Sequence, residues 1–152
     1  MFERFSESAR RVVFWARREA GRLAAEFIEP EHLLAGWVIE DQQDGSVDGE
    51  RPHRIPGARP FLTAECARRL RAALAASAPH GTAMPESVDM AVSKSAKRVL
   101  TAAMQRASGT IGMLHLLWGL IIDEETSASR LLRENGVTAE QIAKAIEAGD
   151  IR

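Results

Sequence analysis

The sequence predicts an all-α protein in which one helical unit occurs twice. Two apolar segments share the pattern His-Leu-Leu-x-Gly, at residues 32–36 and 115–119. The stretches before them also correspond, because residues 6–12 and 93–99 match in residue type everywhere except at Lys94. Tyrosine is absent and runs of β-branched residues are rare, which argues against a sheet protein. We therefore expect two tandem repeats of about four helices each, packed as one pseudo-two-fold domain over residues 1–152.

The first repeat should open with an amphipathic helix followed by an apolar one. Ser6 is a suitable N-cap, and apolar residues then recur at helical spacing as far as Phe27. Pro30 suits the first turn of the second helix, where a missing N–H costs nothing. Glu31 would then lie beside the positive end of the helix dipole.

The remainder of the first repeat, which we place at residues 1–77, is irregular. Asp41–Pro60 contains three glycines and three prolines, which predicts a loop where a third helix should stand. Thr63 then caps a helix that runs to about Ala76. Proline and glycine recur in the following residues, and we interpret 78–91 as a linker.

The second repeat, residues 92–149, begins with a helix capped by Ser93 and continues into the most apolar stretch of the chain, Ile111–Ile122. That stretch is shorter than the ~20 residues that span a bilayer, so we expect a helix buried on all sides. The offset between the copies is 87 residues at the serines but 83 at the histidines, so the second copy lacks about one helical turn. Gly136 should end a third helix, and a capping box at Thr138 should open a fourth, as Thr63 does in the first copy.

Composition is that of a globular protein whose charges nearly balance. The net charge is −1, so no basic field favours nucleic acid or an anionic membrane. The single cysteine, Cys66, excludes an internal disulfide and a cysteine-rich zinc site. The opening residues 1–8 contain an acidic residue at position 3 and no apolar core of a signal peptide, so we expect a cytoplasmic protein.

The titratable and aromatic residues indicate structure rather than chemistry. His32 and His115 occupy equivalent helix starts, and we expect each ring to pack with one nitrogen hydrogen-bonded to nearby backbone. No metal motif surrounds them, and we expect no catalytic residue, no metal and no cofactor. Trp37 and Trp118 should fill the core. Core filling is also favoured for Trp15, with a partner-binding anchor as the alternative.

With the Ser-x-Ser-Ala-[Arg/Lys]-Arg-Val stretch, the Glu-His-Leu-Leu-x-Gly helix start and the doubling in place, the chain resembles the Clp N-terminal domain. That domain is the double-repeat helical module at the front of ClpA- and ClpC-type AAA+ unfoldases, and the opening Met1–Phe5 looks particularly like ClpC. The resemblance implies a non-enzymatic module that receives adaptor or substrate proteins and passes them to a Clp ATPase ring. We expect no membrane partner, because the apolar stretch is too short to cross a bilayer and the net charge is −1. The chain contains no phosphate-loop motif, so it is not itself the motor.

The resemblance also implies binding residues. In ClpC, phosphoarginine is bound through the glutamate of a Gly-Thr-Glu-His motif in each repeat. Here Glu31 keeps that carboxylate, whereas Pro30 removes an N–H and Glu29 adds a negative charge. Leucine stands at the equivalent position 114, so no phosphoarginine is expected in the second repeat. A peptide groove near the N-terminus matches at Phe2 and Lys97, and the partner-binding set we predict is Phe2, Glu3, Phe5, Glu31 and Lys97.

Three functions remain open at this point. The first is docking of adaptors or substrate polypeptides, whether the chain stands alone or belongs to a longer unfoldase. The second is capture of phosphoarginine-marked substrates through the first repeat only. The third is a small helical regulator that binds nucleic acid through arginines of the first helix, Arg10, Arg11, Arg17, Arg18 and Arg22. The balancing acidic residues argue against this third function.

Overall fold

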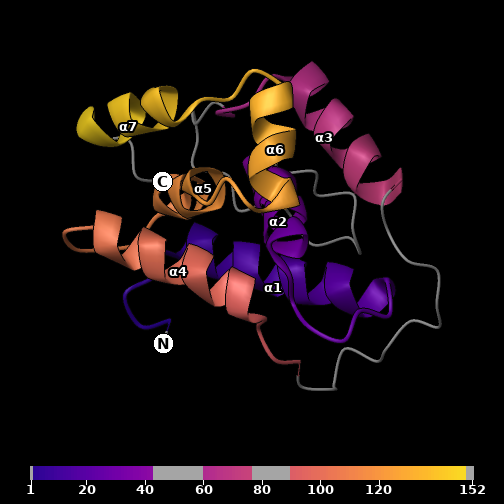
Figure 1. Cartoon of the computed structure of the whole chain (residues 1–152). Coiled ribbons are helices and arrows are strands. Elements are labelled where there is room, and N and C mark those ends of the chain that lie inside the picture. The colour runs from indigo at the N-terminus through magenta and orange to yellow at the C-terminus, as the bar shows by residue number, and fades with distance from the viewer. Residues whose placement is uncertain (1, 43–59, 77–89, 150–152) are drawn as a thin grey trace.

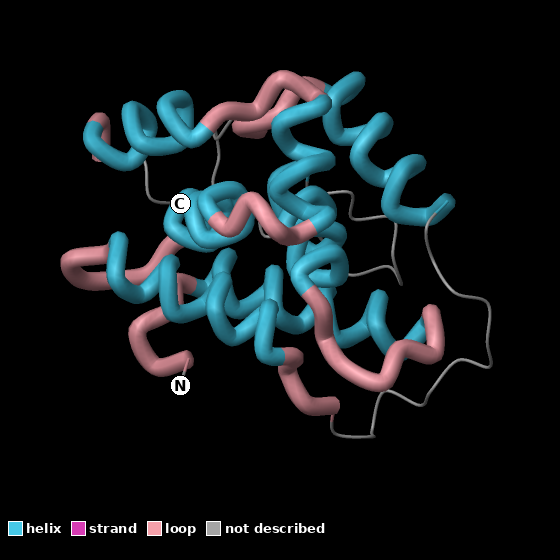
Figure 2. The backbone as a smooth tube through the Cα atoms, viewed as in Figure 1, coloured by secondary structure: helices cyan, strands magenta, loops and turns pink. Residues whose placement is uncertain are grey.

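The computed structural model describes residues 2–42, 60–76 and 90–149, and these form helices without a strand (Figure 2). The predicted all-α class is confirmed. In chain order the helices are α1 (Glu7–Arg22), α2 (Pro30–Gln42), α3 (Ala64–Ala76), α4 (Lys94–Arg106), α5 (Met113–Ile122), α6 (Ser127–Glu134) and α7 (Ala139–Glu147).

The apolar helices α2 and α5 form the central layer of the molecule (Figure 1). Helices α1 and α4 lie on one side of them, and α3, α6 and α7 lie on the other. Ten of the thirteen residues of α2 and eight of the ten of α5 are buried. The amphipathic helices thus cover the two helices that have no polar face.

The two repeats are joined by a pair of reciprocal backbone contacts. Phe5, just before α1, pairs in parallel with Ile111, just before α5. Ile28, just before α2, pairs in the same way with Val92, just before α4. Each contact therefore links the first helix of one repeat to the second helix of the other, as a two-fold relation requires.

The hydrogen bonds of these contacts repeat with the sequence offset. The Ser6 N–H donates to the Ile111 carbonyl over 3.0 Å, and the Ser93 N–H donates to the Ile28 carbonyl over 3.0 Å. Ala91 also belongs to this pairing, because its carbonyl accepts from the Ile28 N–H over 2.9 Å. Residue 91, which we predicted as the end of the linker, therefore already forms a backbone hydrogen bond with the first repeat.

The glycine of each His-Leu-Leu-x-Gly motif lets two helices touch backbone to backbone. A Cβ on Gly36 would collide with the Val12 carbonyl of α1, and one on Gly119 would collide with the Val99 carbonyl of α4. Both positions therefore need glycine, and the requirement is the same in the two copies.

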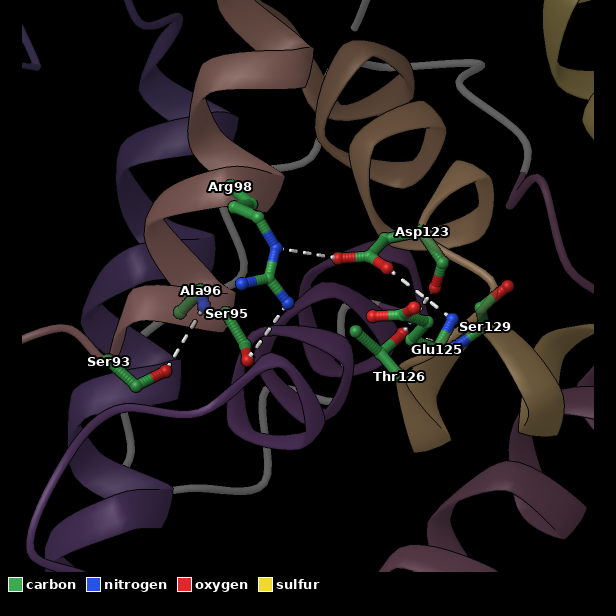
Figure 3. A network of polar contacts seen from close by, with 8 residues as sticks. All are labelled: Ser93, Ser95, Ala96, Arg98, Asp123, Glu125, Thr126 and Ser129. Atoms are coloured by element: carbon green, nitrogen blue, oxygen red, sulfur yellow. Dashed lines mark hydrogen bonds and ion pairs between the residues drawn. The ribbon is translucent and has the colours of Figure 1, made fainter.

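A second repeated feature is a polar clamp between the paired helices. Arg98 Nε lies 3.1 Å from Asp123 Oδ2, and its Nη2 donates to Ser95 Oγ over 3.3 Å (Figure 3). In the first repeat Arg11 makes the equivalent contacts, 2.6 Å to Glu40 Oε1 and 3.2 Å to Ser8 Oγ. The second serine of the Ser-x-Ser motif therefore supports an arginine rather than capping the helix.

The first helix is shorter than predicted. It ends at Arg22 with Leu23 as its C-cap, whereas the spacing suggested a helix as far as Phe27. Ala24 adopts a left-handed conformation, φ 56°, which turns the chain out of the helix. The residues after it extend so that Ile28 can reach Val92, and Phe27 is left 40% exposed.

Most of the other predicted helix starts and stops are confirmed. The helix predicted over Ile111–Ile122 begins only at Met113, because Ile111 pairs with Phe5, and its last residue Ile122 is 38% exposed. Pro30 is the first residue of α2, and α3 runs through Ala76, the last described residue before 77–89. Gly136 has φ 84° immediately after the α6 C-cap, and Thr138 forms the capping box of α7. The loop predicted in place of a third helix and most of the predicted linker lie outside the described residues.

Core filling is confirmed for Trp37, whereas Trp118 and Trp15 are only partly buried. Trp37 is 1% exposed and donates its indole N–H to the Met113 carbonyl over 2.7 Å, which joins α2 to α5 as well as filling the core. Trp118 is only partly buried, and the Arg106 guanidinium lies over its ring, 5.0 Å from the centroid. Trp15 is also partly buried, with its indole N–H donating to Glu40 Oε2 over 3.2 Å.

Candidate docking groove

A groove of about 1100 Å³ opens on the first repeat. The end of α1, the connection that follows it, α2 and α3 form its walls, and Ser127 of α6 lies at its edge. Its apolar lining consists largely of Leu23, Ala25, Phe27, Ala35, Ile39 and Leu74. A cavity of this size with an apolar lining and a few polar groups is typical of a binding site.

Glu31 places a carboxylate in this groove from the first turn of α2. Its Oε1 accepts a hydrogen bond from the Ser127 hydroxyl over 2.8 Å. Its Oε2 is buried and has no hydrogen-bond partner in the described part of the chain. A buried acceptor without a donor costs roughly 1–3 kcal/mol, so this oxygen favours a bound donor.

The start of α2 has little capacity left for an anion. The Glu29 N–H donates to His32 Nδ1 over 2.9 Å, and Pro30 has no N–H. The N–H groups of His32 and Leu33 both donate to the Glu29 carbonyl, over 3.0 and 3.2 Å. Four of the five positions from 29 to 33 therefore offer no free N–H, which removes most of the usual anion site of a helix start.

The two histidines make the same local contact. His115 Nδ1 accepts from the Gly112 N–H over 2.9 Å, as His32 Nδ1 does from Glu29. Burial lowers the pKa of both imidazoles. The carboxylates of Glu31, Glu29 and Glu19 partly oppose that lowering at His32, whereas Arg106 adds to it at His115. Each ring is therefore neutral at pH 7, with its proton on Nε2.

The equivalent position in the second repeat is closed. Leu114 stands where Glu31 stands in the first and is completely buried in the core. The helix cap is thus present in both copies, but the carboxylate and the groove that surrounds it are described only in the first.

Charged side chains in the groove are unequally paired. Arg22 and Glu19 form an ion pair of 2.9 Å, and that pairing raises the pKa of Arg22. Glu26, Glu29 and Glu31 make no ion pair with any described residue. The positive side chains of the opposite wall, Arg68 and Arg71, belong to α3. The α2 side of the groove is therefore negative.

The other predicted partner-binding residues lie away from this groove. Phe5 is 4% exposed, and its ring meets that of Phe2 edge to face at 5.1 Å. Glu3 and Lys97 are exposed, on the N-terminal segment and on α4. The groove is lined by Glu31 and by none of these four residues.

The arginines proposed for nucleic-acid binding all have intramolecular partners. Arg10 donates to the Phe2 carbonyl over 3.3 Å, and Arg11 and Arg22 pair with glutamates. Arg18 lies over the Trp15 ring, 5.9 Å from its centroid, and Arg17 also has an interaction of its own. This face of α1 is therefore a network of internal contacts.

Two classes of site are absent from the described residues. In ranges 2–42, 60–76 and 90–149, no three His, Cys, Asp or Glu side chains gather as metal ligands would. No helix in those ranges combines the length and apolar character needed to cross a membrane.

Comparison with known proteins shows similarity to Clp chaperones. The chain is 32% identical over 150 residues to chloroplastic chaperone protein ClpD2 of Oryza sativa subsp. japonica, covering 95% of this chain. It is 30% identical over 146 residues to the ClpA homolog of Porphyra purpurea, an ATP-binding subunit of ATP-dependent Clp protease, covering 93% of this chain. The chain spans about 15% of the length of these relatives. No family model matches it.

Solved structures agree with these relatives. The N-terminal domain of ClpD from Arabidopsis thaliana superimposes with a TM-score of 0.65 at 26% identity, covering 98% of this chain and 99% of that one. The Hsp104 N-terminal domain from Candida albicans gives a TM-score of 0.64 at 19% identity, covering 97% and 93%. The doubled helical unit, the sequence relatives and the shared fold together show that the chain belongs to the Clp N-terminal domain family.

Proposed function

We propose that this chain is a non-catalytic docking module that binds adaptor proteins or substrate polypeptides for a Clp AAA+ unfoldase. The groove of about 1100 Å³ on the first repeat carries the proposal, because an open, partly apolar cavity suits a polypeptide segment. A Clp ATPase ring is the partner to which the bound polypeptide would pass. We keep a cytoplasmic location as a prediction.

The side chains with nucleophilic potential support a non-catalytic role. Burial raises the pKa of the Cys66 thiol, whose Sγ donates to the Asn135 carbonyl over 3.7 Å. A protonated, hydrogen-bonded thiol is a poor nucleophile. His32 and His115 each use one nitrogen to accept a backbone N–H at a helix start. Cysteine and histidine often form catalytic pairs. Here the contacts of Cys66, His32 and His115 explain these residues as structural ones.

Capture of phosphoarginine through the first repeat is the second candidate. Glu31 favours it, because its buried Oε2 could accept from a guanidinium. The occupied N–H groups of the α2 start and the unpaired Glu29 disfavour the phosphate. The internal partners of the α1 arginines likewise disfavour nucleic-acid binding.

Binding to dephosphorylated casein, a chain that stays unfolded, tests the proposed function. Fluorescence anisotropy of labelled casein should rise on addition of the protein, and Phe27→Ser should weaken binding at least about fivefold by removing an apolar contact in the groove. Phe14→Ser is the matched control, because Phe14 is 53% exposed on α1 and does not line the groove. No casein binding, or equal losses in the two variants, would contradict the proposal.

A further inference from the structure

We infer that the groove on the first repeat binds its polypeptide through an aromatic side chain, which lies over Ala35 in the space that Trp118 fills in the second repeat. The inference rests on the proposed docking function and names the kind of residue that the groove selects. It comes from the pseudo-two-fold relation of the repeats, because residues that line the groove have counterparts in the second copy.

The groove wall α3 and the helix α7 are matched in register. Each packs on the apolar helix of its own repeat, α3 on α2 and α7 on α5. Thr63 accepts the N–H of the residue three positions on over 3.1 Å, and Thr138 does the same over 3.2 Å. Ala67 and Ile142, each four positions after its cap, are both buried. The same register therefore continues along both helices.

Two lining positions of the groove carry small residues in the first repeat and larger ones in the second. Ala35 of α2 and Ala72 of α3 line the groove. Trp118 is the counterpart of Ala35 at the variable position of the His-Leu-Leu-x-Gly motif, and Glu147 is the counterpart of Ala72 in the register of α3 and α7. The first copy therefore has open space where the second has side chains.

A third lining position completes the filling of the second repeat. Arg106 is the counterpart of Glu19, which lines the groove. Its guanidinium carbon lies 5.0 Å from the Trp118 ring centroid, and it pairs with Glu147 over 3.9 Å. Side chains of α4, α5 and α7 therefore meet at the positions whose counterparts line the groove. Trp118 thus shows, within the same fold, which kind of side chain this space accepts.

An aromatic side chain also suits the remaining lining of the groove. Leu23 and Ile39 supply apolar surface, and Phe27 lines the groove with 40% of its surface exposed. An aromatic residue buries about 150–250 Å² and pairs favourably with a second ring edge to face. Because Ala35 and Ala72 end at Cβ, they leave room for such a ring between α2 and α3.

The charges around the groove do not favour one sign of ligand. Arg22 is paired with Glu19 over 2.9 Å. The lining holds acidic and basic side chains together: Glu19, Glu26, Glu29, Glu31, Arg22, Arg68 and Arg71. A neutral ring needs no ion pair, and an arginine of the lining can lie over it, as Arg106 lies over Trp118 and Arg18 over Trp15. Recognition should therefore depend on the ring rather than on ligand charge.

Calorimetry with three capped peptides tests the inference. The peptides share the sequence acetyl-Gly-Ser-Gly-X-Gly-Ser-Gly-amide, with X as tryptophan, leucine or alanine. The tryptophan peptide should bind at least about tenfold more tightly than the alanine peptide and about threefold more tightly than the leucine peptide, because the indole buries more surface and can stack. Since the peptide is neutral, a tenfold rise in NaCl concentration should change its affinity less than about twofold.

Variants that fill the groove from within assign the preference to position 35. Ala35→Trp copies the second repeat and should bring the affinities of the tryptophan and alanine peptides to within about twofold of each other. Ala35→Leu should reduce the preference severalfold, and it keeps the test decisive if the larger side chain prevents folding. Ala148→Trp adds the same ring at the exposed C-cap of α7, which does not line the groove, and should leave the preference unchanged.

Three results would overturn the inference: equal binding of the tryptophan and alanine peptides, tighter binding of the leucine peptide, or an unchanged preference in both Ala35 variants. The casein measurement separates this failure from failure of the proposed function. If casein binds in a Phe27-dependent manner while the peptides show no aromatic preference, docking stands and the aromatic inference is wrong. If neither casein nor any peptide binds, both are wrong.

Discussion

The starts of α2 and α5 are two copies of one structure that have taken different roles. Both carry, as the third residue of the helix, a histidine whose Nδ1 accepts a backbone N–H over 2.9 Å, and both place a glycine against the backbone of the preceding helix. In α2 the residue before the histidine is Glu31, which lines a groove. In α5 it is Leu114, which is completely buried. The histidine cap and the glycine contact are thus needed for the fold in both copies. The position directly before the histidine differs between them and is free to carry function.

The largest difference in stability between the copies should appear when the side chains of Glu31 and Leu114 are truncated to alanine. Leu114→Ala should lower the free energy of unfolding by about 3 kcal/mol, because it leaves a cavity in the core. Glu31→Ala should change it by less than about 1 kcal/mol, since one of its oxygens has no partner to lose. Urea unfolding followed by circular dichroism measures both. Equal losses would mean that Glu31 is a structural residue.

The glycines should respond alike, in contrast to the positions above. Gly36→Ala and Gly119→Ala should each cost about 2 kcal/mol or more, because the added methyl group meets a backbone carbonyl that cannot move aside cheaply. Gly109→Ala is the control, since a Cβ there meets nothing within 4 Å. Urea unfolding again provides the measurement. Tolerance of the change at one motif glycine only would break the equivalence of the repeats.

The polar clamps should differ by a smaller amount. Glu40 is 7% exposed and accepts from both Arg11 and Trp15, so Glu40→Gln should cost about 1–2 kcal/mol. Asp123 pairs with an Arg98 side chain that is 56% exposed, and Asp123→Asn should cost less than about 1 kcal/mol. Thermal denaturation of the two variants compares them. The reverse order would show that burial does not set the strength of the clamp.

The two histidines should titrate in the same direction, which is the least disruptive test of their equivalence. Their pKa values are lowered by burial in the folded state, so the stability they confer is present above the ordinary histidine pKa and is lost as the pH falls below it. Three carboxylates near His32 oppose the lowering, whereas Arg106 reinforces it at His115. Both imidazoles should therefore become protonated only below the ordinary histidine pKa, because burial is the largest influence on each. Nuclear magnetic resonance of the imidazole carbons tests this, and a pKa at or above the ordinary histidine value for either ring would contradict it.

Much of the helical framework could be predicted from the sequence because it depends on local rules. Caps at Ser6, Ser93 and Thr138, proline at the start of α2 and glycine after α6 each act within a few residues. The duplicated motifs also allowed the pairing of the copies to be inferred. The repeat boundaries remain a prediction, because residues 77–89 lie outside the described part of the chain.

The differences from prediction depend on contacts between distant residues. Helical spacing continues to Phe27, but the need for Ile28 to reach Val92 ends α1 at Arg22 through a left-handed alanine that no sequence rule favours. Trp118 was expected in the core because its side chain is large and apolar. In the structure it is only partly buried, and the Arg106 guanidinium lies over its ring. The groove likewise could not be foreseen, because Ser127 orients Glu31 across 96 positions of sequence.

Mapping of a bound polypeptide by amide chemical shifts tests the central claim most directly. On titration with unlabelled dephosphorylated casein, the amides that shift should lie at the end of α1, in the first three turns of α2 and along the α3 wall. The corresponding amides at the start of α5, around Leu114, should not move. Shifts of equal size at the starts of α2 and α5, or shifts confined to the N-terminal segment and α4, would contradict a single docking groove on the first repeat.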